Sequence, residues 1–308
     1  MKRRNFSIIV IAFILLVAGG YYFITLPNQP APTGQLKIAT TIFPIFDIAQ
    51  QIGGDDLEVI LILPPGASPH TYEPTPSQIR ALQNTKIFFK VGLGLDDWAD
   101  SIARSVDTAK IVALDKNIDV KAGLEHEDEE DENNQDHKGQ DPHYWLDARN
   151  AIIMAQTITQ ELSALDPSQA NTYQTNLAIL TEKLNNTHKQ VKNQLSELKR
   201  NKLLVFHDSW NYFAQAYGLE IIAAVEPSPG REPTPQYLQN LTQQINQYNI
   251  SVVFSEPQLP IDTIKPFLDD LNLSYSVLDP IGGVPGRDSY IELLNYNANT
   301  IKAALKYL

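Results

Sequence analysis

The stretch from Asp166 to Arg200 constrains the fold more than any other part of the chain, because it contains no Gly and no Pro after position 167. Asp166 is placed to cap a helix, Pro167 to occupy its first position and Gln169 to complete a capping box. The apolar residues recur every three or four positions and form one stripe: Tyr173, Leu177, Leu180, Leu184, Val191, Leu195 and Leu198. At 1.5 Å per residue this helix would be about 50 Å long. We therefore expect one rigid helix that joins two lobes.

The first 34 residues predict an exported protein. A basic start (Lys2, Arg3 and Arg4) precedes Phe6–Leu26, an uncharged stretch of 21 residues that is long enough to span a bilayer. The basic flank keeps that end in the cytoplasm. We expect an uncleaved membrane anchor followed by a Pro-rich linker. A cleavable signal peptide is the alternative, because residues 17–19 are small. The folded part would then lie in the periplasm or on the outer face of the cytoplasmic membrane.

Cysteine content and charge exclude several classes of protein. The chain has no cysteine, which excludes disulfides, thiolate metal sites and a lipid on an N-terminal cysteine. The net charge is −12, but residues 125–141 hold nine acidic residues and one lysine, so −8 belongs to this segment and about −4 to the rest. A segment so charged, with His126 and His137 in it, is expected to be a disordered insertion. The mildly acidic remainder has no basic patch and gives no support to nucleic-acid binding.

Strand and helix patterns alternate along both halves of the chain. Short apolar runs, each followed by a helical pattern or a turn, predict these strands: 35–42, 57–63, 86–91, 110–114, 202–206 and 275–278. This alternation is typical of an open parallel α/β sheet.

An internal repeat suggests how the strands are divided. Residues 37–53 align without a gap on residues 202–218, and the Glu-Pro-Thr-Pro sequence at 73–76 recurs at 232–235. A duplicated unit predicts two similar (βα)₄ lobes, each with a parallel four-stranded sheet. The expected parts are an anchor and linker (1–34), a first lobe (35–165), the linking helix (166–200) and a second lobe (201–308).

Three of the six histidines fall where such a fold gathers ligands, at the carboxyl ends of parallel strands. His207 ends a predicted strand, His70 follows another, and His143 lies just before a helix that leads back to the linking helix. Asp279 also follows a strand. Three neutral imidazoles and one carboxylate could bind one zinc ion tetrahedrally. His188 is expected to be a solvated residue of the long helix.

Several motifs resemble the zinc- and manganese-binding proteins of ABC importers. They occur in this order: Gln35–Ile42, the Pro-Pro-Gly-Ala-Ser-Pro-His70 loop, residues 72–76, the segment 141–147, residues 206–208, and the tail 278–290. The resemblance covers about residue 35 to 308. It implies two lobes joined by a rigid helix, a metal held between them and a membrane permease as partner. Carried over, the ligands fall on His70, His143, His207 and Asp279, and the acidic insertion resembles the charged loop of the zinc-type members.

We therefore expect a monomeric binding protein that delivers one divalent metal ion, zinc in the first place, to an ABC importer. A manganese-specific protein of the same kind and a surface adhesin are alternatives. A zinc hydrolase is a weaker alternative, because the chain has no HExxH motif and a fourth protein ligand is available to fill the position that a catalytic zinc ion keeps open for water.

Overall fold

The computed structural model describes residues 35–106, 110–123, 139–226, 233–259 and 261–306. The predicted anchor or signal peptide and most of the acidic segment lie outside these ranges. Within them, we find no helix with the length and apolar character needed to cross a membrane. The contacts between residues group 36–308 into one compact unit.

The first sheet is parallel, with strand order β2-β1-β3-β4. Its strands are β1 (Leu36–Thr40), β2 (Leu57–Leu61), β3 (Ile87–Lys90) and β4 (Lys110–Ala113). The intervening helices are α2 (Phe43–Gly53), the 3₁₀ helix η1 (Gly54–Asp56), α3 (Pro76–Ala81) and α4 (Trp98–Ser105). Helix α3 begins with a capping box, in which the backbone N–H of Thr75 donates to the side chain of Gln78 and the backbone N–H of Gln78 donates to Thr75 Oγ1.

The second sheet repeats this topology with strand order β6-β5-β7-β8. Its strands are β5 (Lys202–His207), β6 (Glu220–Glu226), β7 (Val252–Ser255) and β8 (Ser274–Val277). Its helices are α7 (Asn211–Tyr217), α8 (Pro235–Tyr248), the 3₁₀ helix η4 (Ile261–Thr263), α9 (Lys265–Asp270) and α10 (Tyr290–Leu305). Two parallel four-stranded sheets of the same order confirm the predicted α/β class, and they agree with the internal repeat.

Each sheet is covered on both faces, as expected of buried parallel strands. In β1, Ile38 belongs to a large inner core while its neighbour Ala39 belongs to a smaller cluster with the helices α3 and α4. In β5, Val205 faces the inner core and Leu204 faces α8 and α9. The inner core therefore contains residues of both sheets.

The long helix is shorter than the sequence predicts. The helix α5 (Ala148–Leu165) is followed by a 3₁₀ turn, η3 (Pro167–Gln169), and only then by α6 (Ala170–Ser196). Asp166 accepts a hydrogen bond from the backbone N–H of Ser168, while the Gln169 side chain donates to Asp56 and does not complete the predicted capping box. The 27 residues of α6 correspond to about 40 Å.

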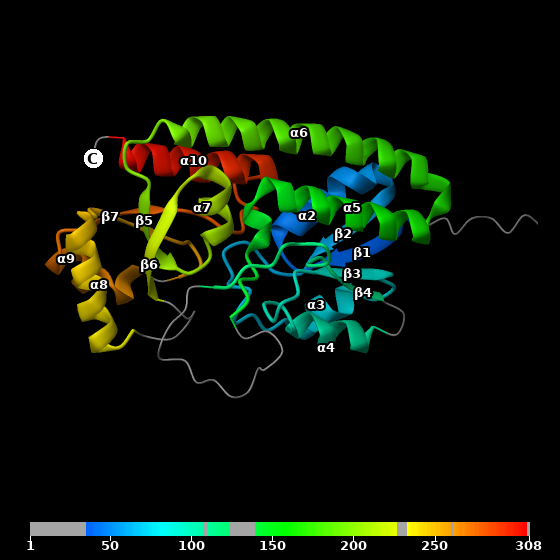
Figure 1. Ribbon diagram of the computed structural model, residues 1–308. Helices are drawn as coiled ribbons and strands as arrows, with labels where there is room; N and C mark the ends of the chain where they lie inside the picture. The colour runs from blue at the N-terminus through cyan, green and yellow to red at the C-terminus, as the bar shows by residue number, and fades with distance from the viewer. Residues whose placement is uncertain (1–34, 107–109, 124–138, 227–232, 260, 307–308) are drawn as a thin grey trace, which may run out of the picture. The chain divides into compact units, whose positions relative to one another are not determined.

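Helix α6 nevertheless joins the two sheets as expected. It packs against α2 and α5 of the first half and against α7 and α10 of the second, and Figure 1 shows it running along all of them. Its buried residues are Tyr173, Leu180, Leu184, Thr187, Val191 and Leu195. The apolar ones are all members of the inner core. The division into lobes at residues 165 and 201 remains a prediction, since residues 36–308 form one contact unit.

Candidate metal centre

Three of the four predicted ligands are histidines, and they come from three separate segments of the chain. His207 is the last residue of β5, and β5 lies between β6 and β7 in its sheet. His70 lies in the loop that follows β2. His143 immediately precedes the 3₁₀ helix η2 (Tyr144–Leu146), which leads into α5. Because the connections on either side of a central strand leave in opposite directions, its carboxyl end opens into a crevice where ligands bind.

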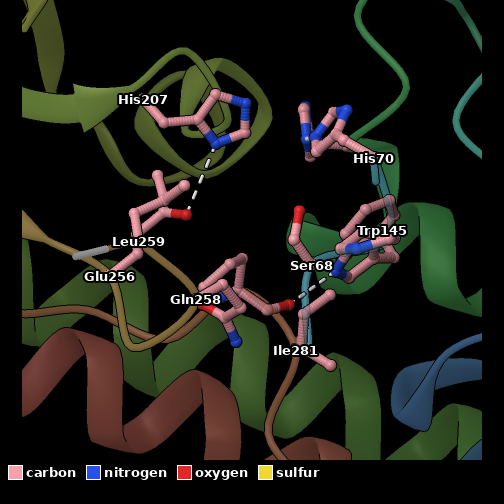
Figure 2. A pocket seen from close by; sticks show the side chains of 11 residues that line it. Ser68, His70, Trp145, His207, Glu256, Gln258, Leu259 and Ile281 are labelled. Atoms are coloured by element: carbon pink, nitrogen blue, oxygen red, sulfur yellow. Dashed lines mark hydrogen bonds and ion pairs between the residues drawn. The ribbon is translucent and has the colours of Figure 1, made fainter. Parts of the chain in front are cut away.

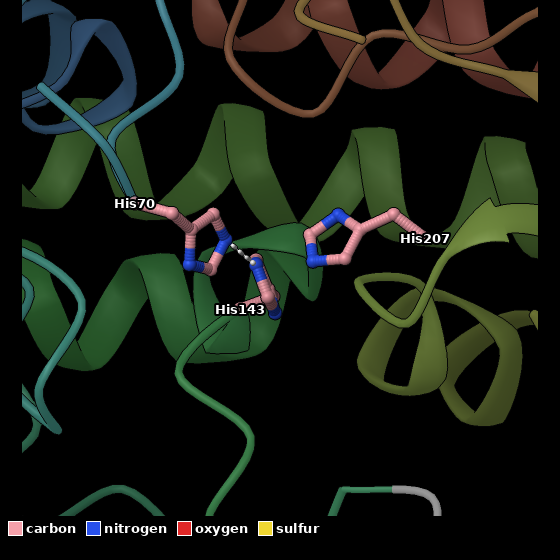
Figure 3. A group of neighbouring side chains, drawn as sticks. All are labelled: His70, His143 and His207. Carbon is pink, nitrogen blue, oxygen red and sulfur yellow. Dashed lines mark hydrogen bonds between the residues drawn. The ribbon is translucent and has the colours of Figure 1, made fainter. Parts of the chain in front are cut away.

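The structure brings these three histidines together, and Figure 3 shows their rings facing one another. One nitrogen atom from each ring can be chosen so that all three lie within 4.8 Å of one another. The two closest atoms are Nε2 of His70 and Nε2 of His143, which are 3.3 Å apart. His143 and His207 are buried, and His70 is half-buried. Their spacing and burial suit a small ion held between imidazole nitrogens.

The ring of His143 is oriented by a carboxylate. Its Nδ1 donates to Oδ1 of Asp141 over 2.8 Å, and its backbone N–H donates to the same oxygen over 2.9 Å. Asn211 in α7 donates to the other oxygen of Asp141 over 3.2 Å. A hydrogen bond at Nδ1 leaves Nε2 unprotonated in the neutral ring, with its lone pair available to a metal.

A second carboxylate, Glu256, orients His207 in the same manner. The Nδ1 atom of His207 lies 3.4 Å from Oε2 of Glu256, as Figure 2 shows. Ser209 Oγ and Trp210 Nε1 donate hydrogen bonds to the other oxygen of Glu256 over 2.6 and 2.8 Å. Both oxygens of the carboxylate therefore have partners that fix its position. Glu256 was not among the ligands or partner residues expected from the sequence. The rule that found the histidines applies to it equally, because Glu256 directly follows β7.

The electrostatics of His70 and His207 differ. Burial, together with the neighbouring rings of His143 and His207, holds the pKa of His70 well below its ordinary value. Burial acts in the same direction on His207, but the charge and hydrogen bond of Glu256 outweigh it and raise the pKa of that ring. The pKa of Glu256 is lowered, because the attraction of His207 and its hydrogen bonds outweigh the effect of burial. Of these two rings, His70 therefore resists protonation and His207 accepts a proton more readily.

The space among the rings is small. The cavity has a volume of about 10 Å³. Figure 2 shows the side chains that line it, which are those of Ser68, Pro69, His70, His143, Trp145, His207, Glu256, Gln258, Leu259, Pro280 and Ile281. A volume of this size corresponds to about one water molecule. A space of this size can hold a single ion among the histidines.

The carboxylate of Asp279 is not part of the histidine group that the described residues form. Asp279 is buried just after β8, and the adjacent Pro280 and Ile281 line the cavity. Its Oδ1 atom accepts hydrogen bonds from the backbone N–H groups of Ile281 and Gly282, each over 3.0 Å. Its Oδ2 atom lies 3.2 Å from Nη1 of Arg287. Asp279 as the fourth ligand therefore stays a prediction.

The remaining histidines are not at this site. His188 was expected to be solvated, but it is only partly exposed, and its ring packs against that of Tyr217 at 5.3 Å. His188 lies four residues after the buried Leu184 and three before the buried Val191, so it lies on the same face of α6 as these residues and is partly covered with them. His126 and His137 lie outside the described residues.

The sequence matches a family described as zinc-uptake complex component A, periplasmic, over residues 38–304. The zinc-binding lipoprotein AdcA of Streptococcus pneumoniae is 26% identical over 301 residues, which cover 95% of this chain and 60% of that protein. The chain therefore spans only about 60% of the length of AdcA.

Other relatives are similar over nearly their whole length. The manganese ABC transporter substrate-binding lipoprotein PsaA of Streptococcus mitis is 30% identical over 293 residues, which cover 90% of this chain and 92% of that protein. Among solved structures, a ZnuA deletion mutant with zinc bound has a TM-score of 0.77 and 28% sequence identity. The match covers 88% of this chain and 98% of the chain of that mutant. The proteins similar to this chain are thus named for zinc in some cases and for manganese in others.

Proposed function

Because the chain belongs to the family of periplasmic zinc-uptake components, we propose that it is the substrate-binding protein of an ABC importer for a divalent transition metal. It captures one ion outside the cytoplasmic membrane and delivers it to a permease. The observation that carries this proposal is the group of three histidines with ligand atoms within 4.8 Å of one another. The family consists of uptake components, so the chain is a binding protein and not an enzyme.

Zinc is the metal that this site favours. Neutral imidazoles are good ligands for zinc, and three of them leave one position of a tetrahedron. We propose that His70, His143 and His207 hold the ion and that Asp279 is the fourth ligand. In the neutral rings of His143 and His207, the carboxylates of Asp141 and Glu256 hold the proton on Nδ1 and leave the lone pair of Nε2 to the metal, which supports binding of a cation.

Manganese is the second candidate, and two observations favour it. A relative of 30% identity is named as a manganese-binding protein. Two buried carboxylates, Asp279 and Glu256, also lie at or next to the cavity, and oxygen ligands are those that manganese prefers. Against it, the ligand atoms that meet among the described residues are all nitrogens.

The remaining parts of the proposal concern location and partners. We propose that residues 1–34 export the chain and tether it to the outer face of the membrane, and that it acts as a monomer with a membrane permease as its partner. Residues 35–165, 166–200 and 201–308 would be the two lobes and their linking helix. Nothing in the described residues supports the surface adhesin considered above.

The metal content of the protein tests this function. Protein purified without added metal and then loaded with zinc should retain about one ion per chain, as expected of a single four-coordinate site. His143→Ala should lose that ion, while Ala substituted for His188, which lies outside the cavity, should keep it. Competition between zinc and manganese then decides the metal. If the wild-type chain retains no metal after loading, the proposed function is wrong.

A further inference from the structure

Arg287 contacts the carboxylate that the proposed site needs as its fourth ligand. Its Nη1 atom lies 3.2 Å from Oδ2 of Asp279, and both side chains are largely or fully buried, with 19% and 3% of their surface exposed. Asp279 is followed directly by Pro280 and Ile281, which line the cavity between the histidines. An arginine is thus paired with a candidate ligand at the wall of the metal site.

A tight turn fixes the position of Arg287. The backbone N–H of Arg287 donates to the carbonyl of Val284 over 2.8 Å, and Pro285 and Gly286 lie between them. Gly286 has φ +81°, so this is a turn in which Pro takes the second position and Gly supplies the positive φ of the third. The guanidinium also lies over the ring of Tyr296, with 4.4 Å from Cζ to the ring centre. The arginine is therefore part of the folded structure and not a free surface cation.

The two oxygens of Asp279 have different partners. Oδ1 accepts hydrogen bonds from two backbone N–H groups, at Ile281 and Gly282, and from Nε2 of Gln258 over 3.2 Å. These three donors fill the capacity of that oxygen. Oδ2 is the oxygen that Arg287 contacts. A metal that takes Asp279 as a ligand therefore has to take the oxygen that Arg287 now holds.

We propose that Arg287 is a specificity-determining residue, which competes with the metal ion for Oδ2 of Asp279. This inference rests on the proposed function, because the competition matters only when the histidines bind a metal. Zinc is already held by three imidazoles and loses little when the carboxylate is occupied. Manganese prefers oxygen ligands and loses more. Arg287 thereby shifts the site toward zinc.

Arg287 itself is under-satisfied. Its Nε atom is buried and has no hydrogen-bond partner among the described residues. An arginine that leaves one donor unpaired is held less firmly than one with all five satisfied. Arg287 can therefore leave Asp279 for part of the time, and the apparent affinity of an oxygen-preferring metal is its intrinsic affinity multiplied by that fraction.

Arg287→Gln tests the inference, because glutamine keeps a polar side chain but has no charge with which to hold the carboxylate. If Asp279 is free for about one tenth of the time in the parent protein, the variant should bind manganese about tenfold more tightly. Zinc affinity should rise by less than about threefold, since the imidazoles supply most of its ligands. The zinc-to-manganese affinity ratio of the full-length chain in detergent solution, measured with a competing chelator, is the readout. Removing a positive charge strengthens both divalent ions alike, so a change in the ratio isolates the effect of the ligand.

The double variant Arg287→Gln, Asp279→Asn is the matched control. Asparagine keeps an oxygen for the backbone N–H groups but cannot offer a second carboxylate oxygen. The gain of manganese relative to zinc should therefore disappear in the double variant compared with Asp279→Asn alone. A shift in the zinc-to-manganese ratio that persists without the carboxylate would overturn the inference, because it would show that Arg287 does not act through Asp279. An unchanged zinc-to-manganese ratio in Arg287→Gln would overturn it as well.

These outcomes are distinct from failure of the proposed function, in which the parent chain binds neither metal. If Arg287→Gln does not fold, Arg287→Lys provides the second measurement. Lysine keeps the charge but loses the planar guanidinium group that contacts the carboxylate and stacks on Tyr296. It should shift the ratio in the same direction by a smaller factor, and a shift toward zinc would contradict the inference.

Discussion

Three of the four candidate ligands at this site have a partner side chain that sets their charge state or direction. His143 is paired with Asp141, His207 with Glu256 and Asp279 with Arg287. Two of these partners are carboxylates, which favour binding of a metal ion. The third is an arginine, whose positive charge opposes it. The partners of the ligands, which do not themselves bind the ion, therefore determine which metal the site binds and how strongly it binds that metal.

Glu256→Gln should weaken zinc binding. An amide at this position has no negative charge, and its nitrogen can turn toward Nδ1 of His207, which would favour the tautomer that has its proton on Nε2. Replacing a partner of a metal ligand in this way lowers affinity by about 10- to 100-fold. Glu197→Gln is the matched control, because Glu197 pairs with Lys302 on the surface. Titration against a chromophoric chelator would measure both, and equal affinities in the two variants would contradict the role of Glu256.

Zinc affinity should also fall in mildly acid solution. Each imidazole binds metal only when neutral. Burial lowers the pKa of His207, but Glu256 outweighs this and raises it overall, whereas His70 has a pKa well below the ordinary value. Binding is therefore complete above the pKa of His207 and is weakened as the pH falls through it, by about tenfold per pH unit for each proton released. Calorimetric titration between pH of about 7.5 and 5.5, on either side of the ordinary histidine value, checks this. An affinity independent of pH over that interval would argue against histidine ligands.

The helices and strands were more predictable than the contacts between side chains. Six strand positions and the long helix follow from apolar periodicity, whereas the positions of β6 and β7 were not predicted. The places of His70 and His207 follow from strand ends. The pairing of Arg287 with Asp279 could not be predicted, because it depends on a turn that brings residues eight positions apart into contact. The predicted start of the long helix was wrong by one turn, since a capping box at Asp166 was expected there. The Gln169 side chain instead donates a hydrogen bond to Asp56, a residue distant in sequence.

The acidic segment can be tested as an element, because its two ends are joined. The backbone N–H of Gly123 donates to the carbonyl of Gly139, and that of Asp141 donates to Lys121, each over 2.8 Å. This pairing of Lys121 and Gly123 with Asp141 and Gly139 positions Asp141, and hence His143. Replacing those residues by an Asn-Gly turn, which suits a two-residue hairpin, should leave zinc affinity and the melting temperature of the metal-free protein nearly unchanged.

The matched variant for this experiment changes one of the hydrogen-bonded residues at the ends of the acidic segment and keeps the segment itself. Gly123→Pro removes the N–H that donates to Gly139. We expect it to weaken zinc binding more than the loss of the whole acidic segment does, because it disturbs the backbone that leads to Asp141. Thermal unfolding and zinc titration of both variants measure the difference. A large loss of stability after removing residues 124–138 would mean that the segment packs on the folded body.

At the scale of the whole molecule, the two sheets share one apolar core. Residues of β1, α6 and β5 belong to the same cluster, so the sheets cannot separate without exposing it. Hydrogen bonds also cross between the two halves next to the metal site. Trp145 donates to the carbonyl of Pro280 over 2.7 Å, the hydroxyl of Tyr290 donates to the carbonyl of Trp145, and the backbone N–H of Tyr290 donates to Asp47 over 3.0 Å.

Metal binding should therefore change the arrangement of the two halves only slightly. A wide opening would break the contacts of α6 and the three crossing hydrogen bonds, whereas binding one ion requires movement of a few side chains and loops. The radius of gyration of residues 35–308 should change by no more than about 1 Å when zinc is added, as in other preorganised binding sites. The melting temperature should rise all the same, because zinc binds the folded state and joins ligands from both halves. Small-angle scattering with and without zinc measures the first quantity and thermal unfolding the second. A large compaction on adding zinc would mean that the metal-free protein opens at α6, contrary to the continuous core through which this helix joins the sheets.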